Sequence, residues 1–133
     1  MSPWSDVLWK TAWVGLGGFL GANARYWLGG WILARWGAAF PWSTFVINVT
    51  GSFILGVFVT LIERGFMLRH VQALTLLIAI GFVGAYTTFS TFEFETLALV
   101  ETSAWLRAFA NAFGSLFAGF LSVWLGVLLA RWL

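Results

Sequence analysis

Residues 81–92 read GFVGAYTTFSTF, and they lie within a long apolar stretch that runs from Val71 to Leu99. Glycine costs about 1 kcal/mol in a helix interior, and the β-branched threonines of this motif add to that cost. We therefore expect the helix to break near the middle of the stretch. A break releases backbone carbonyls, which must be satisfied inside the protein and can serve as ligands of a hard cation.

The composition around this motif is that of a membrane protein. Of 133 residues, 61% are hydrophobic and only 9% are charged, whereas a soluble domain has about 25% charged residues. Too few polar side chains exist to cover a surface that faces water. The chain has no cysteine, which excludes disulfides, thiolate metal sites and cysteine nucleophiles, and its net charge of +2 does not indicate nucleic acid.

Four apolar stretches are long enough to cross about 30 Å of hydrocarbon at about 1.5 Å per residue. The sequence thus predicts an all-α membrane protein with four transmembrane helices, the third broken near its middle, in one domain over residues 1–133. The stretches run from Thr11 to Leu33, from Ser43 to Ile62, from Val71 to Leu99 and from Trp105 to Trp132.

The basic residues give only a slight preference for one orientation in the membrane. The side that holds the N-terminus has Lys10, Arg64, Arg69 and Arg131, while the other side has Arg35 and Arg107. Since this asymmetry sets orientation, such a chain can insert both ways, as an antiparallel homodimer requires. The alternative is a fixed orientation with the N-terminus inside and a weak signal.

Arg25 is the most informative single residue of the first stretch. An arginine near a helix centre costs about 2.5 to 3.5 kcal/mol on insertion scales, so we expect it to face protein, water or an anion. Gly17, Gly18, Gly21 and Gly29 would let another helix approach closely. The alternative is a structural arginine that caps carbonyls or extends to one membrane surface.

Polar and small residues recur every four positions in the second stretch and near the start of the fourth. This spacing places them in a slowly winding stripe, and the two stripes could face each other. Such residues form either a helix–helix interface or a hydrated path. The stripes contain Thr44, Asn48, Ser52, Gly56 and Thr60, and Asn111, Ser115 and Gly119, followed by Ser122.

Phe89 and Phe92 are three residues apart and project to the same side of a helix. Aromatic ring edges carry the positive end of a quadrupole, so ring edges beside neutral donors can hold an anion without trapping it. Ordinary packing explains the same spacing equally well. No acidic residue lies in the first or second stretch, and Glu93 and Glu95 follow the break. A proton-coupled exporter normally needs an intramembrane carboxylate, and nothing indicates an enzyme.

The chain resembles the Fluc family of fluoride channels, also called CrcB. The resemblance covers nearly the whole chain, and the TTFSTF motif after a glycine is its most specific part. The matching segments are GGFLGANARY at 17–26, TFVINVTGSF at 44–53 and GAYTTFSTF at 84–92. The resemblance implies an antiparallel, dual-topology homodimer and passive export of toxic fluoride across a bacterial-type inner membrane.

The resemblance also implies roles for individual residues. Phe89 and Phe92 would line the fluoride pathway, and Asn48 would supply an amide donor to the ion. Thr44, Asn111 and Ser115 would lie on a polar track, and Arg25 would lie near the pore vestibule. Gly84 and Thr87 would offer main-chain carbonyls to a structural Na⁺ at the dimer interface. The alternatives are a small dual-topology multidrug transporter and a non-transporting helical membrane subunit.

Overall fold

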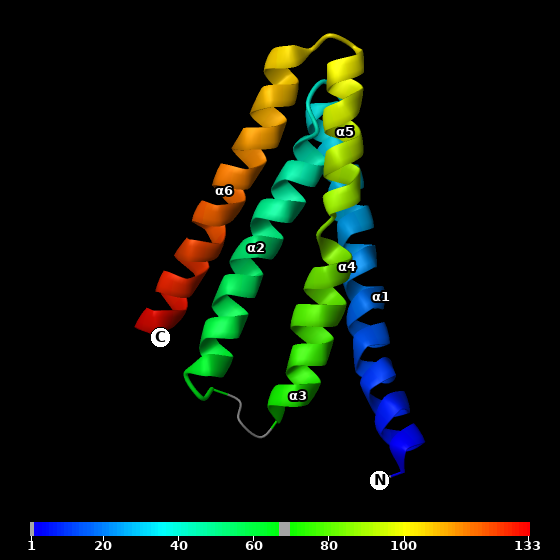
Figure 1. The fold of residues 1–133 in the computed structure, drawn as a ribbon, viewed down its shortest axis with the longest axis vertical. Helices are drawn as coiled ribbons and strands as arrows, with labels where there is room; N and C mark the ends of the chain where they lie inside the picture. Colours follow the sequence, from blue (N-terminus) through cyan, green and yellow to red (C-terminus); the bar gives the residue numbers. More distant parts are fainter. Residues whose placement is uncertain (1, 67–69) are drawn as a thin grey trace.

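The computed structural model describes residues 2–66 and 70–133, and every regular element in this part of the chain is helical. The long helices are α1 (Pro3–Trp36), α2 (Trp42–Glu63) and α6 (Trp105–Trp132). A broken set of shorter helices, residues 71–101, lies between α2 and α6 in the sequence. Figure 1 shows these helices side by side, with the two termini, the last turn of α2 and the start of the broken set at one end.

The ends of α1 follow from local sequence signals. Ser2 is the N-cap, and its hydroxyl accepts a hydrogen bond from the Ser5 amide at 3.2 Å. Pro3 occupies the first turn, where its missing N–H costs nothing. Gly37, with a φ of 72°, ends the helix, and its N–H bonds the Leu33 carbonyl. The 34 residues give α1 a length of about 51 Å.

The predicted break in the third apolar stretch is present. The stretch consists of α3 (Val71–Leu74), the π-helix η2 (Thr75–Val83), α4 (Gly84–Tyr86) and α5 (Phe89–Glu101). Thr87 and Thr88 are extended between α4 and α5, with ψ of 158° and 113°. The π-helix was not expected from the sequence. Such segments are rare and often occur at functional sites.

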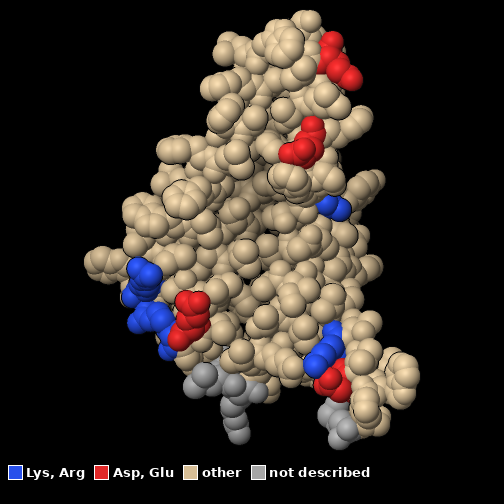
Figure 2. Space-filling model, viewed as in Figure 1, with Lys and Arg blue, Asp and Glu red and all other residues tan. Residues whose placement is uncertain are grey.

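Within the described residues, three helices are long and apolar enough to cross a membrane: 42–63, 71–101 taken together, and 105–132. The protein is therefore an all-helical membrane protein, as predicted. The basic residues Lys10, Arg64 and Arg131 lie at the end with the termini, and Arg69 is outside the described residues. Figure 2 shows a largely uncharged face with lysine and arginine gathered mainly near that end.

Glycines allow two pairs of helices to pack at close range. A Cβ on Gly126 of α6 would lie 2.5 Å from the Phe53 carbonyl oxygen of α2, and Gly56 of α2 is pressed against Val123 in the same way. Gly17 and Gly21 of α1 meet the η2 backbone at Leu77 and Phe82. The stripes of the second and fourth stretches face each other only along part of their length. A Cβ on Gly119 of α6 would lie 3.7 Å from the Ser52 hydroxyl of α2, and Ser122 donates to the Val49 carbonyl at 2.8 Å.

Replacing the glycine at the α2–α6 contact should separate these helices. We expect Gly126→Ala to destabilise the protein by about 1–3 kcal/mol, the usual cost of overpacking, and to lower the thermal unfolding temperature in detergent. Gly114→Ala is the matched control on the same helix, because nothing lies within 4 Å of its Cβ position. An equal effect of both substitutions would contradict this account of the contact.

Candidate functional site

The side chain of Asn48 holds the helix break together. Its Oδ1 accepts a hydrogen bond from the Thr88 amide at 2.8 Å, and its Nδ2 donates to the Thr88 carbonyl at 3.1 Å. These two bonds fix which way the amide group points, because the backbone N–H and carbonyl are distinct partners. Nδ2 has a second hydrogen, which is left for another acceptor. Asn48 therefore stabilises the extended backbone and still presents a donor.

Thr88 also begins the second half of the broken span. Its hydroxyl accepts from the Thr91 amide at 3.3 Å and donates to the Thr91 hydroxyl at 2.8 Å, which is the usual arrangement of a threonine N-cap. On the other side of the break, the Thr87 amide and hydroxyl both donate to the Val83 carbonyl, at 3.0 and 2.9 Å. The four donors next to the break are thus satisfied within the chain.

A groove of about 700 Å³ lies on one side of the break. It brings together Asn48, Phe89, Phe92 and Ser115, four of the six residues predicted to line an ion pathway, together with Thr87. Their donors are uncharged amides and hydroxyls. The remaining wall contains mostly small and apolar residues from α2, η2 and α6. It includes Gly51, Ser52, Leu55, Val83, Leu116, Gly119, Phe120 and Val123.

The two phenylalanine rings differ in their surroundings. Their centroids are 5.9 Å apart with an interplanar angle of 40°, so they form a continuous aromatic surface on one side of α5. Phe92 is 8% exposed, whereas Phe89 is 71% exposed. The expectation that both rings project to the same side is confirmed. One ring is part of the core of this chain, and the other is uncovered.

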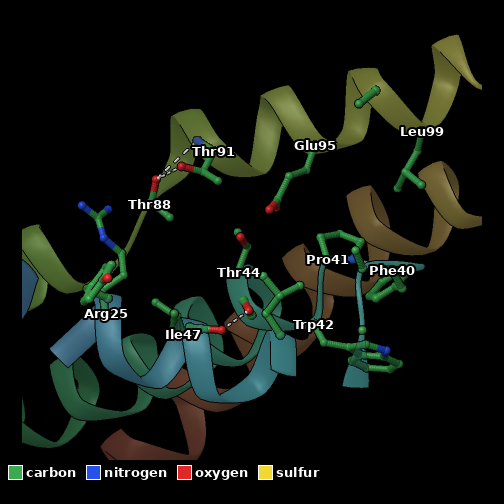
Figure 3. A pocket seen from close by; sticks show the side chains of 18 of the residues that line it. Arg25, Phe40, Pro41, Trp42, Thr44, Ile47, Thr88, Thr91, Glu95 and Leu99 are labelled. Carbon is green, nitrogen blue, oxygen red and sulfur yellow. Dashed lines mark hydrogen bonds between the residues drawn. The ribbon is translucent and has the colours of Figure 1, made fainter. Parts of the chain in front are cut away.

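A second cavity of about 520 Å³ lies between α1, α2 and α5. Figure 3 shows Thr44, Thr88, Thr91 and Glu95 directed into it, with Arg25 at one end. Thr44, the fifth predicted pathway residue, is 4% exposed and so contributes its hydroxyl here rather than to the groove. The wall near Pro41 and Trp42 is apolar.

Arg25 faces protein and a cavity, as the cost of burying its charge predicts. Its Nη1 donates to the Thr87 carbonyl at 3.4 Å, a long bond across the break. Glu95 shares the cavity, but its Oε2 is buried without a hydrogen-bond partner, and the two charges form no salt bridge. Within the described residues the one salt bridge joins Lys10 and Asp6, at 2.7 Å.

Asn111, the sixth predicted pathway residue, lines neither cavity. It is 0% exposed and lies between α5 and α6, where its Nδ2 donates to the Thr96 hydroxyl at 2.8 Å. Ser115, one turn further along α6, donates to Asn111 Oδ1 at 3.4 Å. The polar stripe of the fourth stretch is therefore divided between a buried member and one that reaches the groove.

The carbonyls predicted to bind a cation differ in their availability. Thr88 N–H, which would bond the Gly84 carbonyl in a continuous helix, is directed to Asn48 instead. The Gly84 carbonyl therefore loses its usual partner, and Gly84 lies on an exposed face of the chain. This fits a hard-cation ligand. The Thr87 carbonyl is less free, because the Arg25 guanidinium already approaches it.

Sequence reasoning did not assign a role to Glu95 or Thr96. A signal for Glu95 was present, because Thr88, Thr91 and Glu95 are three and four residues apart and share one face of α5. Thr96 gave no such signal. It is one of several threonines in this part of the chain, and only the packing of α5 on α6 identifies its partner.

The fold and the site define a helical membrane protein whose broken span lies beside a groove of neutral donors and phenyl rings. The family model described as "CrcB-like protein, Camphor Resistance (CrcB)" matches residues 12–127. The chain therefore belongs to the CrcB family.

Curated relatives agree with this assignment, and each is named "Fluoride-specific ion channel FluC". The protein from Acidobacterium capsulatum is 48% identical over 122 residues, which cover 92% of this chain and 96% of the relative. The protein from Oceanobacillus iheyensis is 46% identical over 86% of both chains. The protein from Magnetococcus marinus is 42% identical over 92% of this chain and 98% of the relative.

Removing the Asn48 amide should loosen the break. In Asn48→Leu the Thr88 N–H and carbonyl lose their partners, and an unsatisfied buried group costs about 1–3 kcal/mol. We expect amide hydrogen exchange at residues 87–91 to become roughly 5- to 150-fold faster, as measured by mass spectrometry in detergent. Ser52→Ala is the control, since the Ser52 hydroxyl bonds only the Asn48 carbonyl on its own helix. Unchanged exchange in Asn48→Leu would show that the break does not depend on this side chain.

Proposed function

We propose that this protein is a fluoride-selective channel that mediates passive export of fluoride across the cytoplasmic membrane and so confers resistance to the ion. Support comes from the relatives, which are named as fluoride-specific ion channels. The observation that carries the proposal is the groove at the helix break, where the Asn48 amide, the Ser115 hydroxyl and two phenyl rings meet without a full charge.

The chemistry of this groove suits a small, strongly hydrated anion. Fluoride can leave water only where hydrogen-bond donors replace its hydration shell, and it can leave the protein only where none of them binds too firmly. The free Nδ2 hydrogen of Asn48 and the edges of Phe89 and Phe92 meet both demands. Thr44 and Arg25 would act earlier, in the second cavity, which we assign as the vestibule.

We propose that α1 is a fourth transmembrane span. Its length of 34 residues exceeds the roughly 20 that a crossing needs. Glycines and Arg25, rather than a lack of length, reduce its apolar character. It also packs closely on η2 through Gly17 and Gly21, so it shares the depth of the broken span.

We further propose that two chains assemble as an antiparallel homodimer with dual topology, in the bacterial inner membrane. Phe89 is 71% exposed, and the groove is open on the side of this ring and of Phe120. A second chain would cover these rings and complete the pathway. The weak charge bias between the two ends is compatible with insertion in both orientations.

A structural Na⁺ at the dimer interface is part of the proposal. The Gly84 and Thr87 carbonyls of both chains would hold it, and the ion would compensate the partial negative charge of these oxygens in lipid. One chain offers too few free carbonyls for a cation by itself. A site shared by two chains therefore fits the exposed position of Gly84 better than a site within one chain.

The two alternatives have less support. A small multidrug transporter would bind cations through an acidic residue of its first helix, and that position of the fold holds Arg25. A non-transporting subunit would not need a break with a free donor beside it. Liposomes distinguish the three, because only a channel gives passive fluoride efflux that ignores chloride, and a transporter would couple cation uptake to protons.

The phenyl rings should be required for conduction. We expect Phe89→Ile and Phe92→Ile each to reduce fluoride efflux from liposomes, measured with a fluoride electrode, by about tenfold or more, while the dimer stays intact. Asn48→Ala should give a similar loss because it removes the amide donor. Phe94→Ile is the control, since Phe94 is 73% exposed and lines neither cavity. Normal efflux in both ring variants would remove these residues from the mechanism.

The Na⁺ proposal predicts that assembly depends on sodium. When sodium is replaced by N-methylglucamine, we expect the purified dimer to unfold at a lower temperature and to dissociate at higher dilution. Chromatography in detergent and thermal unfolding check this, with potassium as a control for ion size. Equal stability in all three salts, or a high-resolution map of the dimer without density between the Gly84 carbonyls, would contradict the site.

A further inference from the structure

A chain of hydrogen bonds connects α6 to the backbone that bears Phe92. Asn111 Nδ2 donates to the Thr96 hydroxyl at 2.8 Å, and this hydroxyl donates to the Phe92 carbonyl at 2.7 Å. At the other end, Ser115 donates to Asn111 Oδ1 at 3.4 Å. The Ser115 hydroxyl, which lines the groove, is thus joined through Asn111 and Thr96 to the main-chain carbonyl of Phe92, whose ring lines the same groove.

In the described part of the chain, the Asn111–Thr96 bond is the only hydrogen bond that joins α5 to α6. This bond is buried in the protein interior, as the 0% exposure of Asn111 shows. Extended residues, rather than a continuous helix, connect α4 to α5. The direction of α4 therefore does not fix the direction of α5. The Asn48–Thr88 bonds tie the N-cap residue of α5 to α2, and the contact with α6 holds the part of α5 beyond Phe92.

We propose that Asn111 and Thr96 form a latch that positions Phe92 and orients the Ser115 hydroxyl for the passage of fluoride. This inference rests on the proposed function and makes Asn111 a positioning residue that does not touch the ion. Its amide cannot reach the groove while it bonds Thr96, and its Oδ1 takes up the hydroxyl hydrogen of Ser115. The ion would then compete with Asn111 for that hydrogen, and the 3.4 Å length of the bond makes the exchange easy.

The first test is a mutant cycle in the liposome efflux assay. Asn111→Leu and Thr96→Val each break the latch with little change of shape, and we expect each to lower fluoride efflux by about fivefold. The double variant should be no worse than either single one, and Thr96→Ser, which keeps the hydroxyl, should conduct normally. Loss in Asn111→Leu with normal efflux in Thr96→Val would overturn the proposal, because Asn111 would then act without Thr96.

Measuring Asn111→Leu in a Ser115→Ala background distinguishes a positioning role of Asn111 from a general loss of stability. If Asn111 acts partly through this hydroxyl, Asn111→Leu should cause a smaller further loss in a Ser115→Ala background than in the native chain. Thermal unfolding of the same variants shows whether the protein is still folded. Equal fold-losses in both backgrounds would contradict a role of Asn111 in orienting Ser115.

The second test measures the position of α5 directly. The chain has no cysteine, so Leu97→Cys on α5 and Phe109→Cys on α6, both exposed, can carry spin labels, diluted with unlabelled protein. The distance distribution should broaden in Asn111→Leu and Thr96→Val but not in Thr96→Ser. Asn23→Leu is the matched control, since Asn23 bonds only Phe19 of its own helix. An unchanged distribution would overturn the latch.

The efflux and spin-label measurements distinguish a failure of the proposed function from a failure of the latch. If the native protein carries no fluoride, the proposed function is wrong, and the spin-label distances still decide whether the latch exists. If fluoride passes and the distances do not respond to either substitution, the function stands and the latch does not.

Discussion

Every backbone polar group at membrane depth must find a partner inside the protein, and the structure depends on how the break at Thr87 and Thr88 meets this requirement. An unsatisfied group in hydrocarbon costs several kcal/mol. The Asn48 side chain satisfies both the N–H and the carbonyl of Thr88, so the chain can leave the helix for two residues without a large penalty. The break is stable because a neighbouring helix completes it.

The two cavities meet at the break, since Thr88 lines both of them. The half before it is held against α1 by the glycine contacts at Gly17 and Gly21, and the half after it is bonded to α6 through Thr96. Because the halves rest on different helices, their directions are set independently. The groove with Phe89 opens on one side and the cavity with Arg25 opens on the other.

The sequence predicted those features that depend on local cost and periodicity. The glycines and threonines of residues 81–92 indicated the break, and the four-residue spacing of the second and fourth stretches indicated that they face each other. The π-helix was not predictable, because it forms where Gly81 packs against Gly17, a contact between distant parts of the chain. The same holds for Asn111. The four-residue spacing predicted which side of its helix Asn111 occupies. A polar side chain can bond any nearby partner, however, and only the packing of α5 on α6 selects Thr96.

Apart from the second Nδ2 hydrogen of Asn48, the donors of Asn48, Thr87 and Ser115 beside the groove are paired within the chain. Ser115 is bonded to Asn111, Thr87 to Val83 and one Nδ2 hydrogen of Asn48 to Thr88. In a membrane protein such side-chain bonds are worth about 0.6 kcal/mol on average, so a small anion can take a donor from its partner, and the partner can take it back. A fixed cation would bind the anion more firmly and release it more slowly. A groove of weakly paired neutral donors therefore favours passage over retention, and the guanidinium of Arg25 is kept apart from it, in the neighbouring cavity against the Thr87 carbonyl.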